Sequence, residues 1–211
     1  MKYKGIIFDR DGTLYDSLDV ILRAFDHAIE PFTQKRPTRE EWFAAFGPAE
    51  MDVISKFIGP EKKQEAFNRF FDYYRTHFNE IHLYPGIREL LFELKRNGSK
   101  LMLFTGGGHV STRFCLEQTG ILHLFDALIC GEDVLHPKPH PEGVLKLMKE
   151  QKLQPGETIV VGDAASDVEA GKAAHTFTAW LCWSENAQSS ELNVPPDFTC
   201  RSVDELKKVL T

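Results

Sequence analysis

The chain has 211 residues, of which 42% are hydrophobic, and its formal net charge at pH 7 is −6. That length and hydrophobic content can bury a substantial core in one or two compact units. The basic residues are scattered rather than gathered into a stripe or an arm, which argues against nucleic acid or an anionic membrane surface as the main partner.

The N-terminal residues run directly into a short strand pattern and leave no room for the apolar region of a signal peptide. No apolar run approaches the length that crosses a bilayer, so no membrane partner is expected. The four cysteines are widely spaced, which is typical of small core residues in a reducing compartment rather than of disulfides or a zinc site. We therefore expect a cytoplasmic protein.

Short apolar runs alternate with helical patterns along most of the chain, which predicts an α/β fold with a mainly parallel sheet. Helices with one apolar face are expected near Ile87, Val144 and Val203. The predicted architecture is a Rossmann-like core of three layers, with an irregular loop over 184–196. The predicted strands span residues 4–8, 100–104, 127–130, 158–161 and 176–180.

One segment breaks this alternation, because residues 16–84 show only helical patterns. Apolar and aromatic residues recur there at helical spacing from Leu18 and again from Phe67, which indicates the core of a small helix bundle. We therefore predict two domains. Residues 1–15 and 85–211 would form the α/β core, and residues 16–84 would form an all-helical domain inserted after the first strand.

Polar residues follow four of the predicted strands. In an open parallel sheet the ligand site lies beyond the carboxyl ends of the strands, so these residues are expected to meet. Taken singly, each has a simpler interpretation as a turn, a surface lysine, a helix cap or a first-turn acid. Their presence at four strand ends favours one common site. In chain order they are Asp9 and Asp11, Thr105 and Gly106, Lys138, and Asp163 and Asp167.

Phosphoryl transfer is a chemistry that this set can support. Asp9, Asp11 and Asp163 present hard oxygen ligands, which suit Mg²⁺ together with water and a substrate phosphate. Such an ion would neutralise the acids and allow a phosphate anion to approach Asp9. Asp9 would act as the nucleophile and form an aspartyl-phosphate. Asp11 would protonate the leaving oxygen and later take the proton from water.

Thr105, Gly106 and Lys138 are candidate phosphate-binding residues. The hydroxyl of Thr105, the backbone amides near Gly106 and the ammonium of Lys138 are donors for phosphoryl oxygens. Pro137 and Pro139 flank the lysine and indicate that its backbone is held in place.

Four motifs in correct order carry a family resemblance over nearly the whole chain. They are FDRDGTLYDS, LFTGG, HPKPHPE and VGDAASDVEAGKAA. With these motifs the sequence closely resembles the haloacid dehalogenase superfamily of phosphohydrolases, and within it the phosphoglycolate phosphatase-like members. The helical insert resembles the cap of that family, including its return at Tyr84-Pro85-Gly86, and its loop at Phe46-Gly47-Pro48 resembles the cap loop that faces the active site.

The resemblance implies roles for individual residues. Asp9 would be the nucleophile and Asp11 the acid and base. The Asp9 side chain, the Asp11 backbone carbonyl and Asp163 would hold Mg²⁺, which keeps the Asp11 side chain available for proton transfer. Asp167 would stabilise the metal site or Lys138 without binding the metal directly. Enzymes of this family that cleave carbon–halogen bonds lack an acid at the place of Asp11, so a phosphatase or phosphomutase is favoured.

The phosphoryl group would be oriented by the donors already named, with amides of Arg10, Asp11 and Gly106 assisting. Two places depart from the family pattern. Arg10 is a large cation where an apolar residue is commoner, and it is expected to touch the substrate or the cap. Gly107-Gly108-His109 replaces the usual continuation of the second motif. The candidate cap residues for reading the substrate are Arg23, His27, Arg39 and Trp42.

The expected function is that of a Mg²⁺-dependent phosphatase, acting as a monomer or homodimer on a small phosphorylated metabolite such as a phosphoglycolate-like compound or a sugar phosphate. One alternative is a phosphomutase similar to β-phosphoglucomutase, which uses the same acids. Another is a non-catalytic phosphate-binding or signalling module, since receiver domains also combine clustered aspartates, a threonine, a lysine and Mg²⁺.

Overall fold

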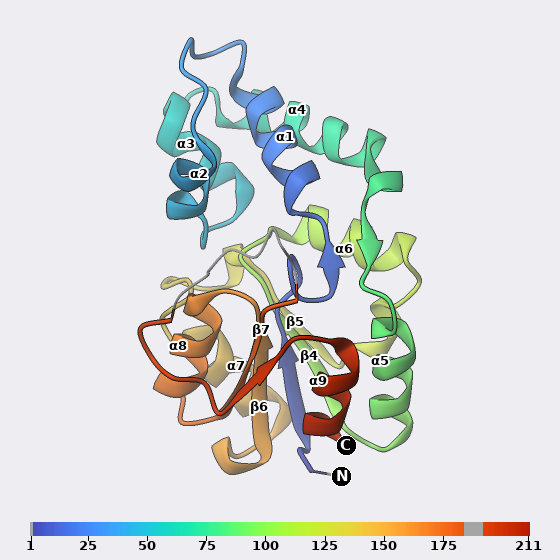
Figure 1. Ribbon diagram of the computed structural model, residues 1–211. Coiled ribbons are helices and arrows are strands. Elements are labelled where there is room, and N and C mark those ends of the chain that lie inside the picture. Colours follow the sequence, from blue (N-terminus) through green and yellow to red (C-terminus); the bar gives the residue numbers. More distant parts are fainter. Residues whose placement is uncertain (1, 184–191) are drawn as a thin grey trace.

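The computed structural model describes residues 2–183 and 192–211. A parallel six-stranded sheet lies in the lower part of the molecule as drawn in Figure 1, with helices on either side of it. Strand β1 lies inside the sheet between β4 and β6, and all four of its residues are buried. In spatial order the strands are β5 (Ala127–Ile129), β4 (Lys100–Phe104), β1 (Gly5–Phe8), β6 (Thr158–Gly162), β7 (Phe177–Leu181) and β8 (Phe198–Cys200).

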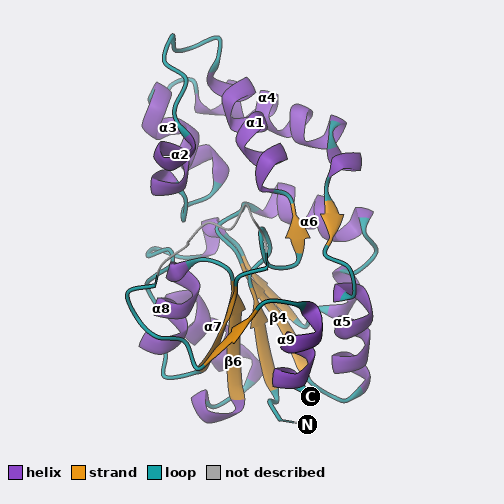
Figure 2. Cartoon of the chain, in the orientation of Figure 1, coloured by secondary structure: helices purple, strands orange, loops and turns teal. Residues whose placement is uncertain are grey.

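Helices cover both faces of this sheet (Figure 2). Successive strand residues point to opposite faces, so Ile6 and Phe8 join one buried cluster and Ile7 joins the other. Because both faces are covered, the strands read as continuous apolar runs rather than as alternating ones. On the Ile7 face lie α7 (Glu142–Gln151) and α8 (Ala165–Ala173), and on the other face lie α5 (Ile87–Arg96), α6 (His109–Gln118) and α9 (Val203–Leu210).

Four further helices gather beyond the carboxyl ends of the strands and pack against one another (Figure 1). Aromatic rings fill their interior, with Phe25 lying 5.0 Å from Trp42 and 4.6 Å from Phe70 between ring centroids. We call these helices the cap helices; the division into two domains at residues 16 and 84 stays a prediction. They are α1 (Leu18–Ile29), α2 (Arg39–Ala45), α3 (Glu50–Ile58) and α4 (Lys63–Thr76).

Two short antiparallel strands connect the cap helices to the core. They are β2 (Tyr15–Asp16) and β3 (His82–Leu83). The prediction of only helical structure from 16 to 84 is therefore wrong at both ends of that segment, because two-residue strands are too short to show an alternating pattern. The single-turn helices are η1 (Phe78–Glu80), η2 (Leu122–Leu124), η3 (Gly131–Asp133) and η4 (Pro155–Glu157).

The α/β class and the mainly parallel sheet are confirmed, and each of the five predicted strands lies within one residue of its expected bounds. Strand β8 was not predicted. Most of the predicted loop at 184–196 lies outside the described residues. Among the described helices, none combines the length and the apolar composition that crossing a bilayer requires.

Candidate active site

The turn after β1 places two acids at the edge of the sheet. The Asp9 amide donates to the Val161 carbonyl at 2.9 Å, which continues the pairing of β1 with β6. The chain then turns at Gly12, whose φ of +81° favours glycine, and a side chain there would collide with the Asp163 carboxylate. Asp9 and Asp11 are buried at this turn, with 5% and 9% of their surface exposed.

Lys138 reaches this turn from a distant part of the chain. Its ammonium donates to Asp9 Oδ1 at 2.7 Å, to Asp167 Oδ1 at 2.6 Å and to the Phe104 carbonyl at 3.2 Å. Its loop is held by Glu142, which accepts hydrogen bonds from the amides before the lysine. The structure therefore brings together the residues that follow β1, β4, β5 and β6.

Three buried carboxylates lie together beside Lys138. Each of Asp9, Asp163 and Asp167 offers an oxygen within 4.8 Å of the others. Burial raises the pKa of Asp9 to about 7, and Lys138 opposes this shift while Asp167 adds to it. Three acids beside one ammonium leave excess negative charge in a buried place, which is costly without a further cation. An all-oxygen set with this charge fits Mg²⁺, so the residues present suit the expected metal.

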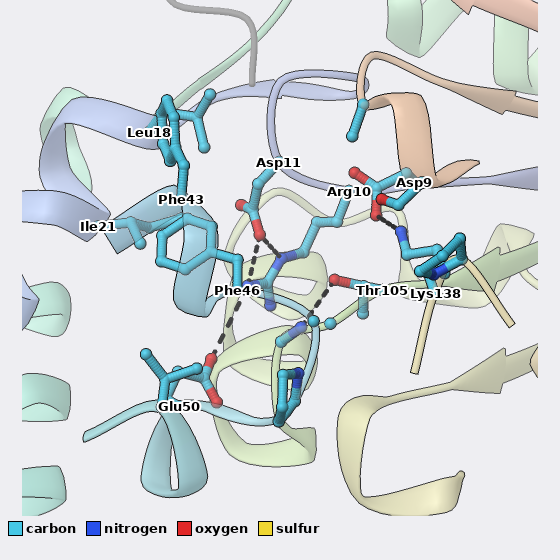
Figure 3. Close-up of a pocket in the computed structure, with 18 of the residues that line it drawn as sticks. Asp9, Arg10, Asp11, Leu18, Ile21, Phe43, Phe46, Glu50, Thr105 and Lys138 are labelled. Atoms are coloured by element: carbon cyan, nitrogen blue, oxygen red, sulfur yellow. Dashed lines mark hydrogen bonds and ion pairs between the residues drawn. The ribbon is translucent and has the colours of Figure 1, made fainter. Parts of the chain in front are cut away.

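Thr105 and Gly106 directly follow the last residue of β4. The Thr105 side chain lies on the same side of the cavity as Asp9 and Lys138 (Figure 3). The Thr105 side chain is buried, and its hydroxyl accepts a hydrogen bond from the Gly107 amide at 3.0 Å. A side chain at Gly106 would lie 2.9 Å from the carbonyl oxygen of Gly47, so the cap loop packs directly on this turn. Thr105, Gly106, Lys138, Asp9 and Asp11 line one cavity of about 370 Å³.

The cap helices close the other side of this cavity with apolar side chains. The loop at Gly47 and Pro48 also lines it, as the resemblance implied. Four cap residues were expected to contact the substrate. None of them is among the described residues that line the cavity. Two of them form ion pairs elsewhere: Arg23 with Glu80 at 2.6 Å, and Arg39 with Asp19 at 3.2 Å.

The other two candidates are also engaged within the cap. The Trp42 indole is buried and donates to Asp26 Oδ1 at 3.0 Å. The His27 ring packs 5.1 Å from Tyr73 between centroids.

Arg10 makes contacts that the sequence did not reveal. The residue is 2% exposed, and its guanidinium donates from Nε to Asp11 Oδ2 at 2.8 Å and from Nη1 to Thr112 Oγ1 at 2.6 Å. It also lies 3.9 Å from the carboxylate of Glu50, at the start of α3. Arg10 therefore touches the cap, which is one of its two expected contacts, and it holds the proposed acid and base in place.

Glu50 was missed by the sequence analysis and is 5% exposed. Its carboxylate accepts from the Gly108 amide at 2.7 Å and from the Ser111 hydroxyl, so a cap residue binds the first turn of α6 in the core. Burial raises the pKa of Glu50, which Arg10 and these donors oppose. The only signal in the sequence was the unusual Arg10, whose buried charge needs an acidic partner.

The two departures from the family pattern are linked in space. A side chain at Gly107 would collide with the Arg10 guanidinium, and one at Gly108 would lie 2.6 Å from Glu50 Oε2. The two glycines therefore make room for the buried arginine and the cap glutamate. His109 follows them at the start of α6 and bonds to Asp133 at 3.0 Å rather than lining the cavity.

Comparison with known proteins identifies the family. A model of the haloacid dehalogenase-like hydrolases matches residues 6–181, which is most of the chain. The chain is a haloacid dehalogenase-like hydrolase. This confirms the family resemblance that the four sequence motifs indicated, and the match extends across the cap helices as well as the core.

Curated relatives match this hydrolase along its whole length. Pyrophosphatase PpaX from Bacillus anthracis is 28% identical over 212 residues, covering 100% of this chain and 98% of the relative. Pyrophosphatase PpaX from Bacillus cereus strain G9842 matches with the same identity and coverage. Both are named for an activity on pyrophosphate.

Solved structures share the fold of the hydrolase. A predicted phosphoglycolate phosphatase from Haemophilus somnus 129pt superposes with a TM-score of 0.83 at 23% identity, covering 100% of this chain and 99% of that chain. CbbY from Rhodobacter sphaeroides, solved in complex with phosphate, gives a TM-score of 0.84 at 22% identity, covering 97% and 96% of the two chains. At this level of identity the similarity establishes the fold.

Proposed function

We propose that this hydrolase is a metal-dependent phosphatase that cleaves a phosphate monoester of a small metabolite through an aspartyl-phosphate on Asp9. The observation that supports this best is the position of the Asp9 carboxylate. It follows the last residue of β1 and lines the cavity, 2.7 Å from the Lys138 ammonium and beside two further buried acids.

In the first step a carboxylate oxygen of Asp9 attacks phosphorus, and the bond from phosphorus to the leaving oxygen breaks. Asp11 gives that oxygen a proton. Thr105 and Lys138 donate hydrogen bonds that orient the phosphoryl group, since both line the cavity beside Asp9. In the second step water attacks phosphorus, Asp11 takes the water proton, and Asp9 is released together with inorganic phosphate.

Asp11 is held in a definite orientation for these proton transfers. One carboxylate oxygen accepts from Arg10 at 2.8 Å, and the other accepts from the Ser17 hydroxyl at 2.7 Å. A carboxylate oxygen has two lone pairs, so Asp11 can carry the proton for the leaving group while the Ser17 hydroxyl stays hydrogen-bonded to the same oxygen.

Mg²⁺ is the metal proposed for this site, with Asp9, Asp163 and the backbone carbonyl of Asp11 as its protein ligands. When bound, it supplies the positive charge that allows a phosphate dianion to approach a carboxylate. Asp167 bonds to Lys138 at 2.6 Å and to the Ala164 amide at 3.1 Å, which supports its proposed role behind the ligands.

Removing the metal is expected to stop turnover. Treatment with a chelator, followed by dialysis, should abolish release of inorganic phosphate from an aryl phosphate, and added Mg²⁺ should restore it. The reason is that the acids around Asp9 would otherwise repel the substrate dianion. Full activity of the metal-free protein would contradict the proposed ligand set.

Replacing Asp11 with asparagine tests the proton transfers. An amide of similar size cannot exchange the proton, so kcat for an alkyl phosphate should fall about 10²–10⁴-fold, which is the usual contribution of a general acid or base. Steady-state release of phosphate measures this. An unchanged kcat would exclude Asp11 from proton transfer.

The same assays separate the phosphatase from the phosphomutase alternative. A phosphatase releases inorganic phosphate in step with substrate loss, whereas a mutase given a sugar phosphate returns an isomer without net release. The signalling alternative finds no support in the comparisons, because the family match is to hydrolases and extends across the cap helices.

A further inference from the structure

The cavity at the proposed active site has two chemically different ends (Figure 3). Asp9, Thr105 and Lys138 lie at one end, where the phosphoryl group would bind. At the other end the cap helices present apolar side chains, among them Ile21 and Phe43. A substrate whose phosphorus faces Asp9 therefore extends its leaving group toward the cap.

Asp11 lies between these two ends (Figure 3). Its place is suited to the proposed proton donor, because the leaving oxygen of a substrate bound in this direction passes beside it. The group attached to that oxygen then contacts the cap end of the cavity, so the side chains there select the leaving group.

The cap end is formed by several separate elements. Leu18 and Ile21 come from α1, Phe43 comes from α2, and Phe46 follows α2. The rings of Phe43 and Phe46 meet edge to face, 5.5 Å apart between centroids. A pocket with such a lining binds by burying apolar surface of its ligand.

Positive charge in the cavity is already neutralised. Among the described residues that line it, the cations are Lys138 and Arg10. Lys138 pairs with Asp9 at the phosphoryl end. Arg10 pairs with Asp11 at 2.7 Å and also bonds to Thr112. Residues 184–191, which the structure does not describe, contain no lysine or arginine.

The other charged residues of the described lining are acids, which are unfavourable to a further anion. Glu50 lines the cavity from the start of α3, and Glu169 lines it from α8 of the core. Arg39 lies over the Phe43 ring, 4.8 Å from the centroid, but it does not line the cavity and it pairs with Asp19. A second carboxylate or phosphate on the substrate would therefore lose its hydration without gaining a counter-charge.

From this arrangement we infer that the substrate is a phosphate monoester of an uncharged, largely apolar alcohol or phenol. This inference rests on the proposed phosphatase function and adds the class of leaving group. Under this inference the substrate differs from phosphoglycolate and pyrophosphate, to which the names of two similar proteins refer, because each of those compounds carries a second anionic group.

A substrate series on the unmodified protein tests the inference. With Mg²⁺ present, kcat/KM is measured for benzyl phosphate, n-butyl phosphate, glycerol 3-phosphate, 2-phosphoglycolate and pyrophosphate. We expect benzyl phosphate to exceed 2-phosphoglycolate and pyrophosphate by at least about 10-fold, the lower end of what one extra methylene contributes in an apolar pocket. The leaving group of both benzyl phosphate and 2-phosphoglycolate is a primary alcohol. A difference in kcat/KM between these two substrates therefore reflects mainly the group attached to that alcohol, which makes them the decisive pair.

The outcomes are distinct. Turnover of 2-phosphoglycolate or pyrophosphate equal to or better than that of benzyl phosphate would overturn the inference and leave the phosphatase function standing. No phosphate release from any member of the series would overturn both.

A pair of variants tests the location of the selectivity. Phe43→Lys places an ammonium at the cap end, where it can pair with the carboxylate of 2-phosphoglycolate. We expect the kcat/KM for 2-phosphoglycolate, divided by that for benzyl phosphate, to rise at least about 10-fold. This is the lower end of the effect of one apolar group in such a pocket. Phe92→Lys makes the same change on α5, where the ring is 45% exposed, and should leave the ratio unchanged. Equal ratios in the two variants would show that the cap end does not select the leaving group. If Phe43→Lys does not fold, the substrate series decides alone.

Discussion

Asp9→Asn is expected to abolish phosphate release while leaving the protein folded. The asparagine amide is a poor nucleophile, so no aspartyl-phosphate forms and kcat should fall by at least about 10³-fold, a conservative figure for the loss of a nucleophile. The amide oxygen can still accept a hydrogen bond from Lys138, which lies 2.7 Å from Asp9 Oδ1. The variant also removes one negative charge from a buried cluster of acids. Repulsion among these acids should therefore decrease, and the folded state should stay stable.

The measurement is steady-state phosphate release from an aryl phosphate, with circular dichroism to verify the fold. Asp72→Asn is the matched control, because it makes the same change on an exposed part of α4. Its activity should equal that of the unmodified protein. Substantial turnover by Asp9→Asn would exclude this carboxylate as the nucleophile.

Arg10→Leu is expected to lower the free energy of unfolding strongly. The guanidinium is 2% exposed and contacts Asp11, Thr112 and Glu50. Leucine would leave two buried carboxylates without this cation, and breaking such a buried pair costs about 3–5 kcal/mol. The resemblance to the family implies an apolar residue at this place, so we expect the cost to come from the partners rather than from the turn itself.

Urea unfolding of a double-mutant cycle with Glu50→Gln measures this coupling. In the Arg10→Leu background, Glu50→Gln should restore part of the lost stability, because it neutralises one of the stranded carboxylates. Arg113→Leu is the control, since Arg113 is exposed on the same helix as Thr112, and its effect should stay within about 0.5 kcal/mol. Purely additive effects of Arg10→Leu and Glu50→Gln would refute the proposed pairing.

The strands and the composition of the site could be predicted because both depend on local patterns. Central parallel strands are buried on both faces, so each appears as an apolar run, and topology places their carboxyl ends together. This is why Asp9, Lys138 and Asp163 could be assigned to one edge of the sheet from sequence alone. Strand β8 could not be recognised, because Phe198-Thr199-Cys200 is too short to show a pattern.

The environment of Arg10 could not be predicted, because it depends on how the cap helices sit on the core. Glu50 is 40 positions away along the chain and reaches Arg10 only through tertiary packing. The same packing explains why charged cap residues were poor candidates for substrate contact. Arg23 is paired with Glu80 on the cap, whereas Phe43 turns out to line the cavity.

In the proposed mechanism, Asp9 becomes phosphorylated beside a metal ion held by Asp163. A crystal structure of the protein with Mg²⁺ and beryllium trifluoride, which mimics a phosphoryl group on a carboxylate, tests this most directly. We expect beryllium bonded to an Asp9 oxygen, its fluorides contacted by Thr105 and Lys138, and Mg²⁺ bound by both Asp9 and Asp163. Beryllium trifluoride on another residue, or Mg²⁺ bound away from Asp9 and Asp163, would contradict it.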